Sequence, residues 1–268
     1  MVILISFIPK GAVKLMKYAI VIPARYASSR LPGKALLKET GKYLVQHVYE
    51  QAKKSKIANE IIIATDDTRI EIAAKKFGAK VVMTKKSHQS GTDRIAEVAL
   101  NLPFDIYLNL QGDEPLIEPE SIDLLFKQLI ESPEVPMATL GTPIREEKDW
   151  LNPNCVKVVN DLHGRALYFS RSPIPFVRDG KPDFTQRPTP FLLHLGIYAY
   201  RREFLLKMAQ IPMHLLERIE KLEQLRVLGA GYTISLGVVE DRSLGIDTRQ
   251  DYELFVSRYR QITQNKAA

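Results

Sequence analysis

Short apolar, β-branched segments alternate with segments of helical periodicity along the first half of the chain. The apolar segments, which we expect to be strands, are 18–23, 60–65, 80–84 and 106–110. The segments that follow each of them, which we expect to be helices, are 43–54, 68–77, 93–100 and 118–131. This alternation is typical of βαβ units. It predicts an α/β fold with a Rossmann-like, mostly parallel sheet.

The pattern changes at about Met137, where strand-like pieces alternate with turn residues and a proline-rich segment follows. We interpret 137–200 as a smaller antiparallel region beside the main sheet, and 17–136 with 201–268 as the main α/β domain. Further along, we expect strands at 191–200 and 233–239, one amphipathic helix at 215–228, and a closing helix at 248–259. The charges of helix 215–228 are expected to face solvent.

Composition and charge narrow the class of protein. A hydrophobic fraction of 45% and a charged fraction of 26% are those of an ordinary soluble protein, and no apolar run is long enough to span a membrane. The single cysteine, Cys155, cannot form an internal disulfide, which fits a reducing cytosol. Residues 1–16 lack the basic start and the cleavage site of a signal peptide, so we interpret them as an atypical N-terminal extension.

The net charge of +7 indicates anionic partners. Nucleic-acid-binding proteins concentrate their cations on one arm or helix, whereas the lysines and arginines here are spread along the chain. We therefore expect small anionic substrates, and neither a nucleic-acid nor a membrane partner.

The strongest candidate site begins where the first strand ends. The loop after it carries three cations, two hydroxyls and a glycine: Arg25, Ser28, Ser29, Arg30, Gly33 and Lys34. A buried strand followed by a basic loop is how α/β proteins bind phosphates at the carboxyl end of a sheet. The alternative is an ordinary solvated loop. Ser90, before the helix at 93–100, has two compatible roles, as helix N-cap and as part of a helix start that faces an anion.

Two aspartates follow strand ends beside a glycine. Asp113 comes after 106–110, and Asp247 lies between the last strand and the closing helix. Carboxylates in such positions suit Mg²⁺, which takes carboxylate, phosphate and water oxygens. The alternative is that each aspartate caps a turn. His194 is either a hydrogen-bonded core group or a ligand, and no second His or Cys lies at the spacing of a zinc site.

Several reaction classes lack their motifs. The sequence contains no G-x-x-x-x-G-K-[ST], no G-x-G-x-x-G and no G-x-S-x-G, which disfavours P-loop NTPases, dinucleotide redox enzymes and serine hydrolases. From the residues alone, the prediction ends at a Mg²⁺-dependent transfer that involves a nucleotide.

From Met16 to about Phe255 the chain resembles the CMP-Kdo synthetases, which are 3-deoxy-manno-octulosonate (Kdo) cytidylyltransferases. The matching motifs are Ile22-Pro-Ala-Arg25, Ser28-x-Arg30-Leu-Pro-Gly-Lys34, Ala64-Thr-Asp-Asp67, His88-x-Ser-Gly-Thr-Asp-Arg94, Asn109-Leu-Gln-Gly-Asp-Glu-Pro115, Asn152-Pro-Asn154, Lys157-Val-Val159, Ala166-Leu-Tyr-Phe-Ser-Arg171, His194-Leu-Gly-Ile-Tyr198, Leu222-Glu-Gln-Leu-Arg226 and Gly245-Ile-Asp-Thr248. The chain departs from the family at Tyr43 and before Gly245, where proline is usual, and neither departure removes a charge.

The resemblance implies a nucleotidyltransferase fold and the reaction of CTP with Kdo to give CMP-Kdo and pyrophosphate. It implies that Arg25, Lys34, Asp113 and Asp247 are catalytic, with both aspartates on Mg²⁺. The implied nucleotide-binding residues are Arg25, Ser28, Ser29, Lys34, Ser90 and Asp113. The implied sugar-binding residues are Arg30, Gln111, Arg171, His194, Tyr198, Glu223 and Gln224, with Arg171 suited to the carboxylate. The general base stays open, since Asp247 and a metal-lowered hydroxyl pKa fit equally well.

The family also implies a homodimer formed through the smaller region, and a cytoplasmic role in lipopolysaccharide synthesis. The nearest alternative is another acid-sugar cytidylyltransferase, such as a CMP-sialic acid synthetase. Arg30-Leu-Pro-Gly-Lys34 and the Glu223-Gln224 pair favour Kdo. An alternative of another class, a non-catalytic polyanion-binding protein, rests on the net charge alone.

Overall fold

The structure is a computed structural model of the 268-residue chain, and it describes residues 15–28, 30–88, 90–240, 242 and 245–267. Most of the expected N-terminal extension lies outside these residues, as does Ser29.

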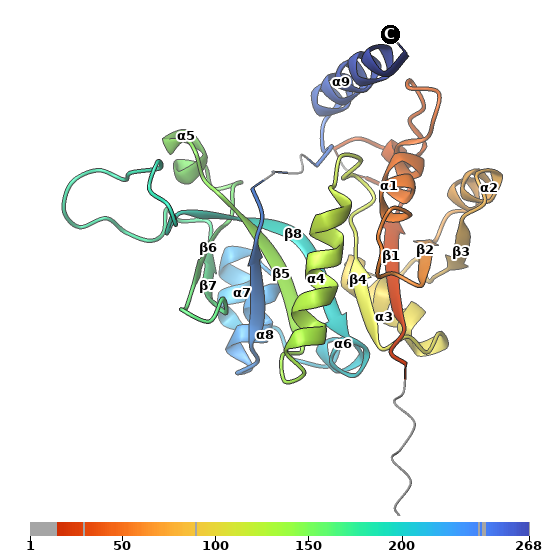
Figure 1. The fold of residues 1–268 in the computed structure, drawn as a ribbon. Coiled ribbons are helices and arrows are strands. Elements are labelled where there is room, and N and C mark those ends of the chain that lie inside the picture. Colours follow the sequence, from red (N-terminus) through yellow and green to blue (C-terminus); the bar gives the residue numbers. More distant parts are fainter. Residues whose placement is uncertain (1–14, 29, 89, 241, 243–244, 268) are drawn as a thin grey trace, which may run out of the picture.

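The described strands form one mixed sheet whose main order is β3-β2-β1-β4-β8-β5-β9 (Figure 1). Their bounds are β1 Tyr18–Ala24, β2 Glu60–Thr65, β3 Lys80–Met83, β4 Ile106–Asn109, β5 Met137–Pro143, β6 Lys157–Asn160, β7 Ala166–Ser170, β8 Leu192–Arg201 and β9 Ile234–Val238. β1 pairs in parallel with β2 and β4, β2 with β3, and β5 with β9. β8 runs antiparallel to both β4 and β5. The predicted α/β class and mostly parallel sheet are therefore confirmed.

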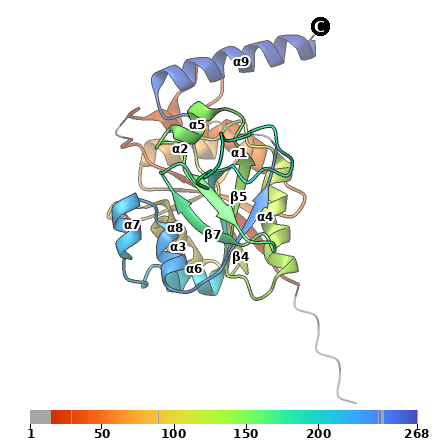
Figure 2. The same cartoon turned by 90° about the vertical axis from the view of Figure 1, so that its left-hand side faces the viewer.

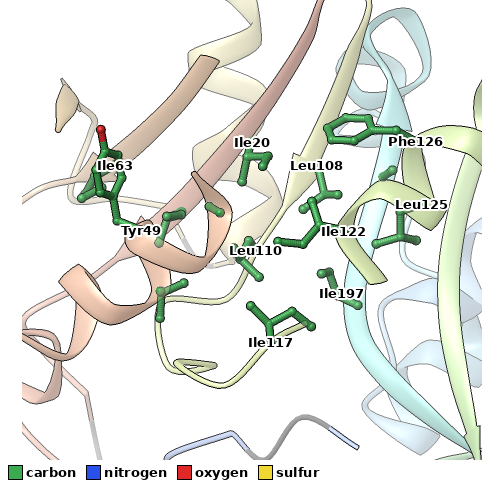
Figure 3. Packing of buried hydrophobic residues seen from close by; sticks show 14 of the residues in the cluster. Ile20, Tyr49, Ile63, Leu108, Leu110, Ile117, Ile122, Leu125, Phe126 and Ile197 are labelled. Carbon is green, nitrogen blue, oxygen red and sulfur yellow. The ribbon is translucent and has the colours of Figure 1, made fainter. Parts of the chain in front are cut away.

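Helices cover both faces of the sheet. They are η1 Lys34–Leu36 (3-10), α1 Leu44–Ala52, α2 Thr68–Lys76, α3 Gly91–Asn101, α4 Pro119–Glu131, α5 Glu147–Leu151, α6 Arg202–Met208, α7 Leu215–Glu220, α8 Gln224–Gly229 and α9 Arg249–Ala267. One core lies under α1 and α4, where Tyr49, Ile122 and Phe126 pack with Ile20 and Leu108 of the sheet (Figure 3). Alternate residues of the same strands enter a second core with α3, α6 and α8. Both faces of these strands are buried, so their sequences read as continuous apolar runs.

The position of the expected antiparallel region was wrong in part. β5 and all but the last residue of β8 lie within 137–200, and both are central strands of the main sheet, not strands beside it. β8 enters between β4 and β5, and Asn109 of β4 pairs with Tyr198 of β8. β6 and β7 branch from β8 as a hairpin, and the segment between β7 and β8 extends away from the sheet (Figure 1). The division of the chain into two domains stays a prediction.

The single helix predicted at 215–228 was also wrong, because the chain turns between α7 and α8. Lys221 adopts a left-handed conformation with φ of 55°, which ends α7. The charges there do not all face solvent: Glu217 is buried and accepts two hydrogen bonds from Arg226, at 2.8 and 2.6 Å. An ion pair across the turn therefore joins α7 to α8.

The closing helix α9 is longer than expected and lies at the end of the molecule where β1 ends (Figures 1 and 2). Tyr252, Phe255 and Val256 pack against Leu44 and Ile246. Thr248 begins the helix as predicted, since its hydroxyl accepts a hydrogen bond from the Asp251 N–H at 3.2 Å. Across the described residues, no helix combines the length and the apolar character that a membrane span requires.

Candidate active site

A cavity of about 460 Å³ opens where β1 and β4 end. We call it the strand-tip cavity. The polar side chains that line it come from the loops after β1 and β4, the start of α3 and the segment before α9: Arg25, Ser28, Arg30, Lys34, Arg94, Gln111, Asp113 and Asp247. Parallel strands bring these distant segments to one edge of the sheet.

Two glycines allow the loops to approach each other. Gly33 has φ of 69° and donates its N–H to the Tyr26 carbonyl at 2.8 Å, which turns the chain back toward the sheet at Lys34. At Gly112, a Cβ atom would lie 2.9 Å from the Pro23 carbonyl oxygen, so a larger residue would push the loops after β1 and β4 apart. The cavity therefore depends on close backbone packing on both sides.

Lys34 lies between the two predicted metal ligands. Its ammonium group donates a hydrogen bond to Asp113, and its Nζ atom lies 3.4 Å from Asp247 Oδ1. It also donates to the Ile246 carbonyl at 3.1 Å. Arg30 forms a second ion pair with Asp247 at 2.9 Å. The predicted meeting of the basic loop with both aspartates is thus present in the folded chain.

The metal-binding groups of the cavity are carboxylates, which suit Mg²⁺ better than they suit a metal that prefers sulfur or nitrogen ligands. Within the described part of the chain, no group of three or more His, Cys, Asp or Glu side chains is arranged to hold a metal ion. Two carboxylates are the protein contribution that Mg²⁺ commonly takes, because phosphate and water oxygens complete its octahedron. Asp113 and Asp247 would hold such an ion, with Lys34 and Arg30 now balancing their charge.

Arg25, Ser28 and Ser90 contribute to the cavity in different ways. Arg25 is exposed at the cavity wall, and Ser28 also lines the cavity, with its N–H donating to the Tyr26 carbonyl at 2.9 Å. Ser90 forms a capping box with Asp93, through N–H···O bonds of 3.0 and 3.1 Å. The N-cap role predicted for Ser90 is confirmed, and Gly91 beside it brings the start of α3 to the cavity.

A second group of polar residues, the helix-turn cluster, adjoins the cavity: Thr92, His194, Tyr198, Tyr200, Glu223 and Gln224. The Thr92 hydroxyl donates to Glu223 at 3.0 Å, which ties α3 to the α7–α8 turn. Burial raises the pKa of Glu223, and it raises the pKa values of the two tyrosines. Gln224 is buried, and its side-chain Nε2 has no hydrogen-bond partner within the described residues. A buried donor without a partner is costly, so it points to a ligand that completes it.

His194 also contacts residues outside this cluster. Its Nε2 lies 3.1 Å from the Thr139 hydroxyl, and its ring packs against Phe169 with 4.9 Å between centroids. Burial lowers its pKa to about 3, so the imidazole is neutral at physiological pH. The hydrogen-bonded interpretation of His194 therefore matches the geometry, and its contact with a sugar stays a prediction.

Arg171 is fixed by backbone groups near the cluster. Its Nε donates to the Glu220 carbonyl at 2.7 Å and its Nη1 to the Pro153 carbonyl at 2.9 Å. Lys157, which is fully buried, supports it by donating to the Arg171 carbonyl at 2.6 Å. Burial lowers the pKa of Lys157. Among the described residues, Arg171, His194, Tyr198, Glu223 and Gln224 do not line the strand-tip cavity.

Three polar residues of this area were missed by the sequence analysis: Arg94, Lys157 and Thr92. Arg94 is fully buried, lines the cavity and pairs with Asp66 at 2.9 Å. A charged residue within an apolar helical or strand pattern, as at Arg94 and Lys157, was the available signal.

Gln111 connects the two groups. Its side chain lines the cavity, and its Nε2 lies 3.4 Å from Asn109 Oδ1 and 3.5 Å from the Gly196 carbonyl of β8. The cavity offers cations and carboxylates, which suit a metal-bound polyphosphate. The helix-turn cluster offers buried hydroxyl, amide and imidazole groups, which suit a hydroxylated molecule. Together they can align two substrates for a transfer between them.

Comparison with known proteins points the same way. A family model described as cytidylyltransferase matches residues 19–234. The 3-deoxy-manno-octulosonate cytidylyltransferase of Geotalea uraniireducens is 50% identical over 248 residues, which are 91% of this chain and 99% of that protein. Its counterpart from Rhodopirellula baltica is 48% identical, over 91% of this chain and 98% of that protein.

Solved structures agree with these relatives. CMP:2-keto-3-deoxy-manno-octonic acid synthetase complexed with CTP is 44% identical to the chain, with a TM-score of 0.86 over 91% of this chain and 99% of that one. A 4-diphosphocytidyl-2C-methyl-D-erythritol synthase is 13% identical, with a TM-score of 0.60 over 91% of this chain and 98% of that one. The latter likeness shows a shared fold alone.

Proposed function

The chain belongs to the 3-deoxy-manno-octulosonate cytidylyltransferase family, and we propose that it joins CTP and Kdo to give CMP-Kdo and pyrophosphate. The observation that carries this proposal is the meeting of Lys34 with Asp113 and Asp247 in one cavity. In the reaction, the anomeric hydroxyl of Kdo forms a bond to the α-phosphorus of CTP. The bond from that phosphorus to the bridging oxygen breaks, and pyrophosphate leaves.

Arg25 and Lys34 bind the triphosphate in this proposal. Phosphoryl-type transfer depends on alignment and on charge stabilisation more than on covalent help from the protein. The Arg25 guanidinium can hold two phosphate oxygens, and the Lys34 ammonium acts as a point charge. The hydroxyls of Ser28 and Ser29, and the N-terminus of α3 beside Ser90, assist in binding the triphosphate. Since Lys34 already lies against two carboxylates, it is held in place before the nucleotide arrives.

Asp113 and Asp247 hold Mg²⁺ in this proposal, as their position and chemistry support. When bound, the ion would neutralise phosphate charge and lower the pKa of a coordinated hydroxyl. Asp247 is the alternative acceptor for the proton of the sugar hydroxyl, because its carboxylate lines the cavity. Both routes fit the arrangement.

The helix-turn cluster, Gln111, Arg30 and Arg171 bind Kdo in this proposal. The buried, unpaired Nε2 of Gln224 supports it, since a sugar hydroxyl or carboxylate would supply the missing acceptor. Arg171 suits the carboxylate of Kdo, and His194, Tyr198 and Glu223 suit its hydroxyls. The neutral state of His194 fits hydrogen bonding to a hydroxyl group.

We propose the remaining properties on the family resemblance: a homodimer, a cytoplasmic location and a role in lipopolysaccharide synthesis. Region 137–200 is the proposed dimerisation region. Sedimentation of the purified protein would test the dimer, and a monomer at micromolar concentration would contradict it.

A pyrophosphate-release assay tests the proposed function. Purified protein is mixed with CTP, UTP or ATP and with Kdo or N-acetylneuraminate, with Mg²⁺ or with EDTA. We expect release with CTP and Kdo that EDTA abolishes. Release with N-acetylneuraminate in preference to Kdo would indicate a CMP-sialic acid synthetase. Salt-sensitive RNA binding without any release would indicate a polyanion-binding protein, and full activity in EDTA would contradict the role of Mg²⁺.

A further inference from the structure

The loop between β1 and η1 carries the cations of the strand-tip cavity, and Tyr26 lies at its start. The Tyr26 carbonyl accepts the N–H groups of Ser28 and Gly33, at 2.9 and 2.8 Å, so it closes the loop on itself. Its ring packs on the turn as well, because a Cβ atom at Gly33 would lie 3.2 Å from the ring. Tyr26 thus determines the shape of the loop through both its backbone and its side chain.

Arg69 of α2 stacks on this ring from outside the cavity. Its guanidinium carbon lies 3.3 Å from the centre of the Tyr26 ring. Arg25, Ala27 and Ser28 line the cavity, whereas within the described residues neither Tyr26 nor Arg69 does so. The stack therefore supports the loop from outside the cavity lining.

Asp67 fixes the orientation of the Arg69 guanidinium. Its two carboxylate oxygens accept from Arg69 Nε at 2.9 Å and from Nη2 at 2.7 Å. The same carboxylate caps α2 by accepting the Arg69 N–H at 2.9 Å. The Asp67 N–H in turn donates to the buried Thr65 hydroxyl at 3.2 Å, at the end of β2. The hydrogen bond from Arg69 lowers the pKa of Asp67 to about 2, so the pair stays ionised at neutral pH.

We propose that Tyr26, Arg69 and Asp67 are positioning residues that hold the cationic loop in the shape that binds the nucleotide triphosphate. This inference rests on the proposed function, and it gives a role to the last aspartate of Ala64-Thr-Asp-Asp67. Asp247 and Asp113 hold Arg30 and Lys34 in place, whereas the Tyr26 contacts shape the first part of the loop, which carries Arg25 and Ser28. A preformed loop binds more tightly because less ordering is left for the binding step.

The test measures CTP binding to the full-length protein by isothermal titration calorimetry, with Mg²⁺ and without Kdo. For Arg69→Ala and for Tyr26→Leu we expect CTP to bind about fivefold more weakly, the size of an exposed cation–π contact. The double variant should bind no more weakly than either single variant, because both remove the same contact. In steady-state assays the KM for CTP should rise while the KM for Kdo stays unchanged.

Conservative variants separate stacking from charge. Tyr26→Phe keeps the ring and should retain CTP affinity, whereas Arg69→Lys keeps the charge but not the planar stack and should lose it. The control is Lys75→Ala, which breaks the exposed ion pair with Glu71 on the same helix and should bind CTP normally. Wild-type affinity in Arg69→Ala would overturn the inference, and so would normal binding by Arg69→Lys or additive losses in the double variant. Absence of pyrophosphate release from the wild-type protein with CTP and Kdo would instead overturn the proposed function.

Discussion

The strand-tip cavity and the helix-turn cluster are neighbours, and the ion pair of Arg30 in the cavity is far more exposed than the ion pair that joins α7 to α8. In the cavity, Arg30 and Asp247 form an ion pair although their side chains are 65% and 42% exposed. Beneath the helix-turn cluster, Glu217 and Arg226 pair with side chains that are 8% and 16% exposed. An exposed pair is worth little and exchanges partners easily, whereas a buried pair is costly to break. The first arrangement suits groups that must release each other for a ligand, and the second suits a permanent support.

The pKa shifts of the helix-turn cluster also result from burial. Burial raises the pKa of Glu223 and lowers that of His194, and in both cases it favours the neutral form. The pKa values of Tyr198 and Tyr200 are also raised by burial. In the helix-turn cluster, burial thus disfavours the charged forms of these side chains. A polar sugar fits such a surface, and a polyphosphate fits the cavity beside it.

Removing either cavity aspartate should have the largest effect. We expect Asp113→Ala and Asp247→Ala each to lower turnover by a factor of about a thousand or more, because a metal ion supplies several kcal/mol of charge stabilisation. Pyrophosphate release measures the effect, and circular dichroism checks the fold. Asp179→Ala, which removes an exposed carboxylate of the β7–β8 segment, serves as control and should be fully active. An aspartate variant with near-normal activity would exclude that residue from the metal site.

Removing Arg25, an exposed cation of the cavity, should have the next largest effect on activity. We expect Arg25→Ala to lose about 2–4 kcal/mol of transition-state stabilisation, as when an oxyanion-hole donor is removed. The measure is kcat/KM for CTP, with the unfolding free energy as a check, which should not change because Arg25 is exposed. Arg178→Ala, at an exposed site outside the cavity, is the matched control. A tenfold or smaller drop would argue against the proposed role.

Substitution of Gln224 tests whether this side chain binds a ligand or stabilises the fold. We expect Gln224→Met to raise the KM for Kdo about tenfold, the loss of one or two hydrogen bonds, and to leave the KM for CTP unchanged. Its unfolding free energy should not fall, because the amide Nε2 that is removed has no hydrogen-bond partner in the described protein. A destabilised variant with a normal KM for Kdo would show that the side chain is structural.

The last prediction concerns stability and not activity. We expect the free energy of unfolding to depend on pH because of His194. The folded-state pKa of about 3 lies below the ordinary value of 6.5, so the unfolded chain binds a proton that the folded chain excludes. Stability from this source is complete above pH 6.5 and declines as the pH falls toward 3. In His194→Gln, which cannot titrate, the stability difference from wild type should shrink by about 2 kcal/mol between pH 7.5 and pH 5, because pH 5 lies about 1.5 units below the unfolded pKa and each unit corresponds to about 1.4 kcal/mol. Urea unfolding at both pH values measures it, and an unchanged difference would contradict the assigned burial.

Sequence reasoning succeeded best at the strand tips. The runs that became β1, β2 and β4 are bounded by polar residues, prolines and glycines, so their ends were visible in the pattern. Parallel strands bring their carboxyl ends to one edge, which made the approach of Lys34 to Asp113 and Asp247 predictable. The motifs then supplied the family, which comparison with known proteins confirmed.

It failed where distant contacts outweigh the local pattern. Residues 215–228 have a helical pattern throughout, yet Lys221 breaks the helix and the buried Glu217–Arg226 pair joins the two parts. Likewise the strand predicted at 191–200 was expected in an antiparallel region beside the main sheet, but β8 pairs with β4 in the centre of the sheet. Sequence spacing reports neither the partner of a strand nor the partner of a charge.

By itself, the sequence determined the layered α/β architecture, the strand ends and most of the polar residues of the cavity, because apolar periodicity and breaker residues act over a few positions. The tertiary structure alone decided that Arg94 and Lys157 are buried, that Gln224 keeps an unpaired donor, and that Arg69 lies on Tyr26. Burial and pairing are properties of the whole packed chain, since each depends on side chains that come from other segments of the sequence.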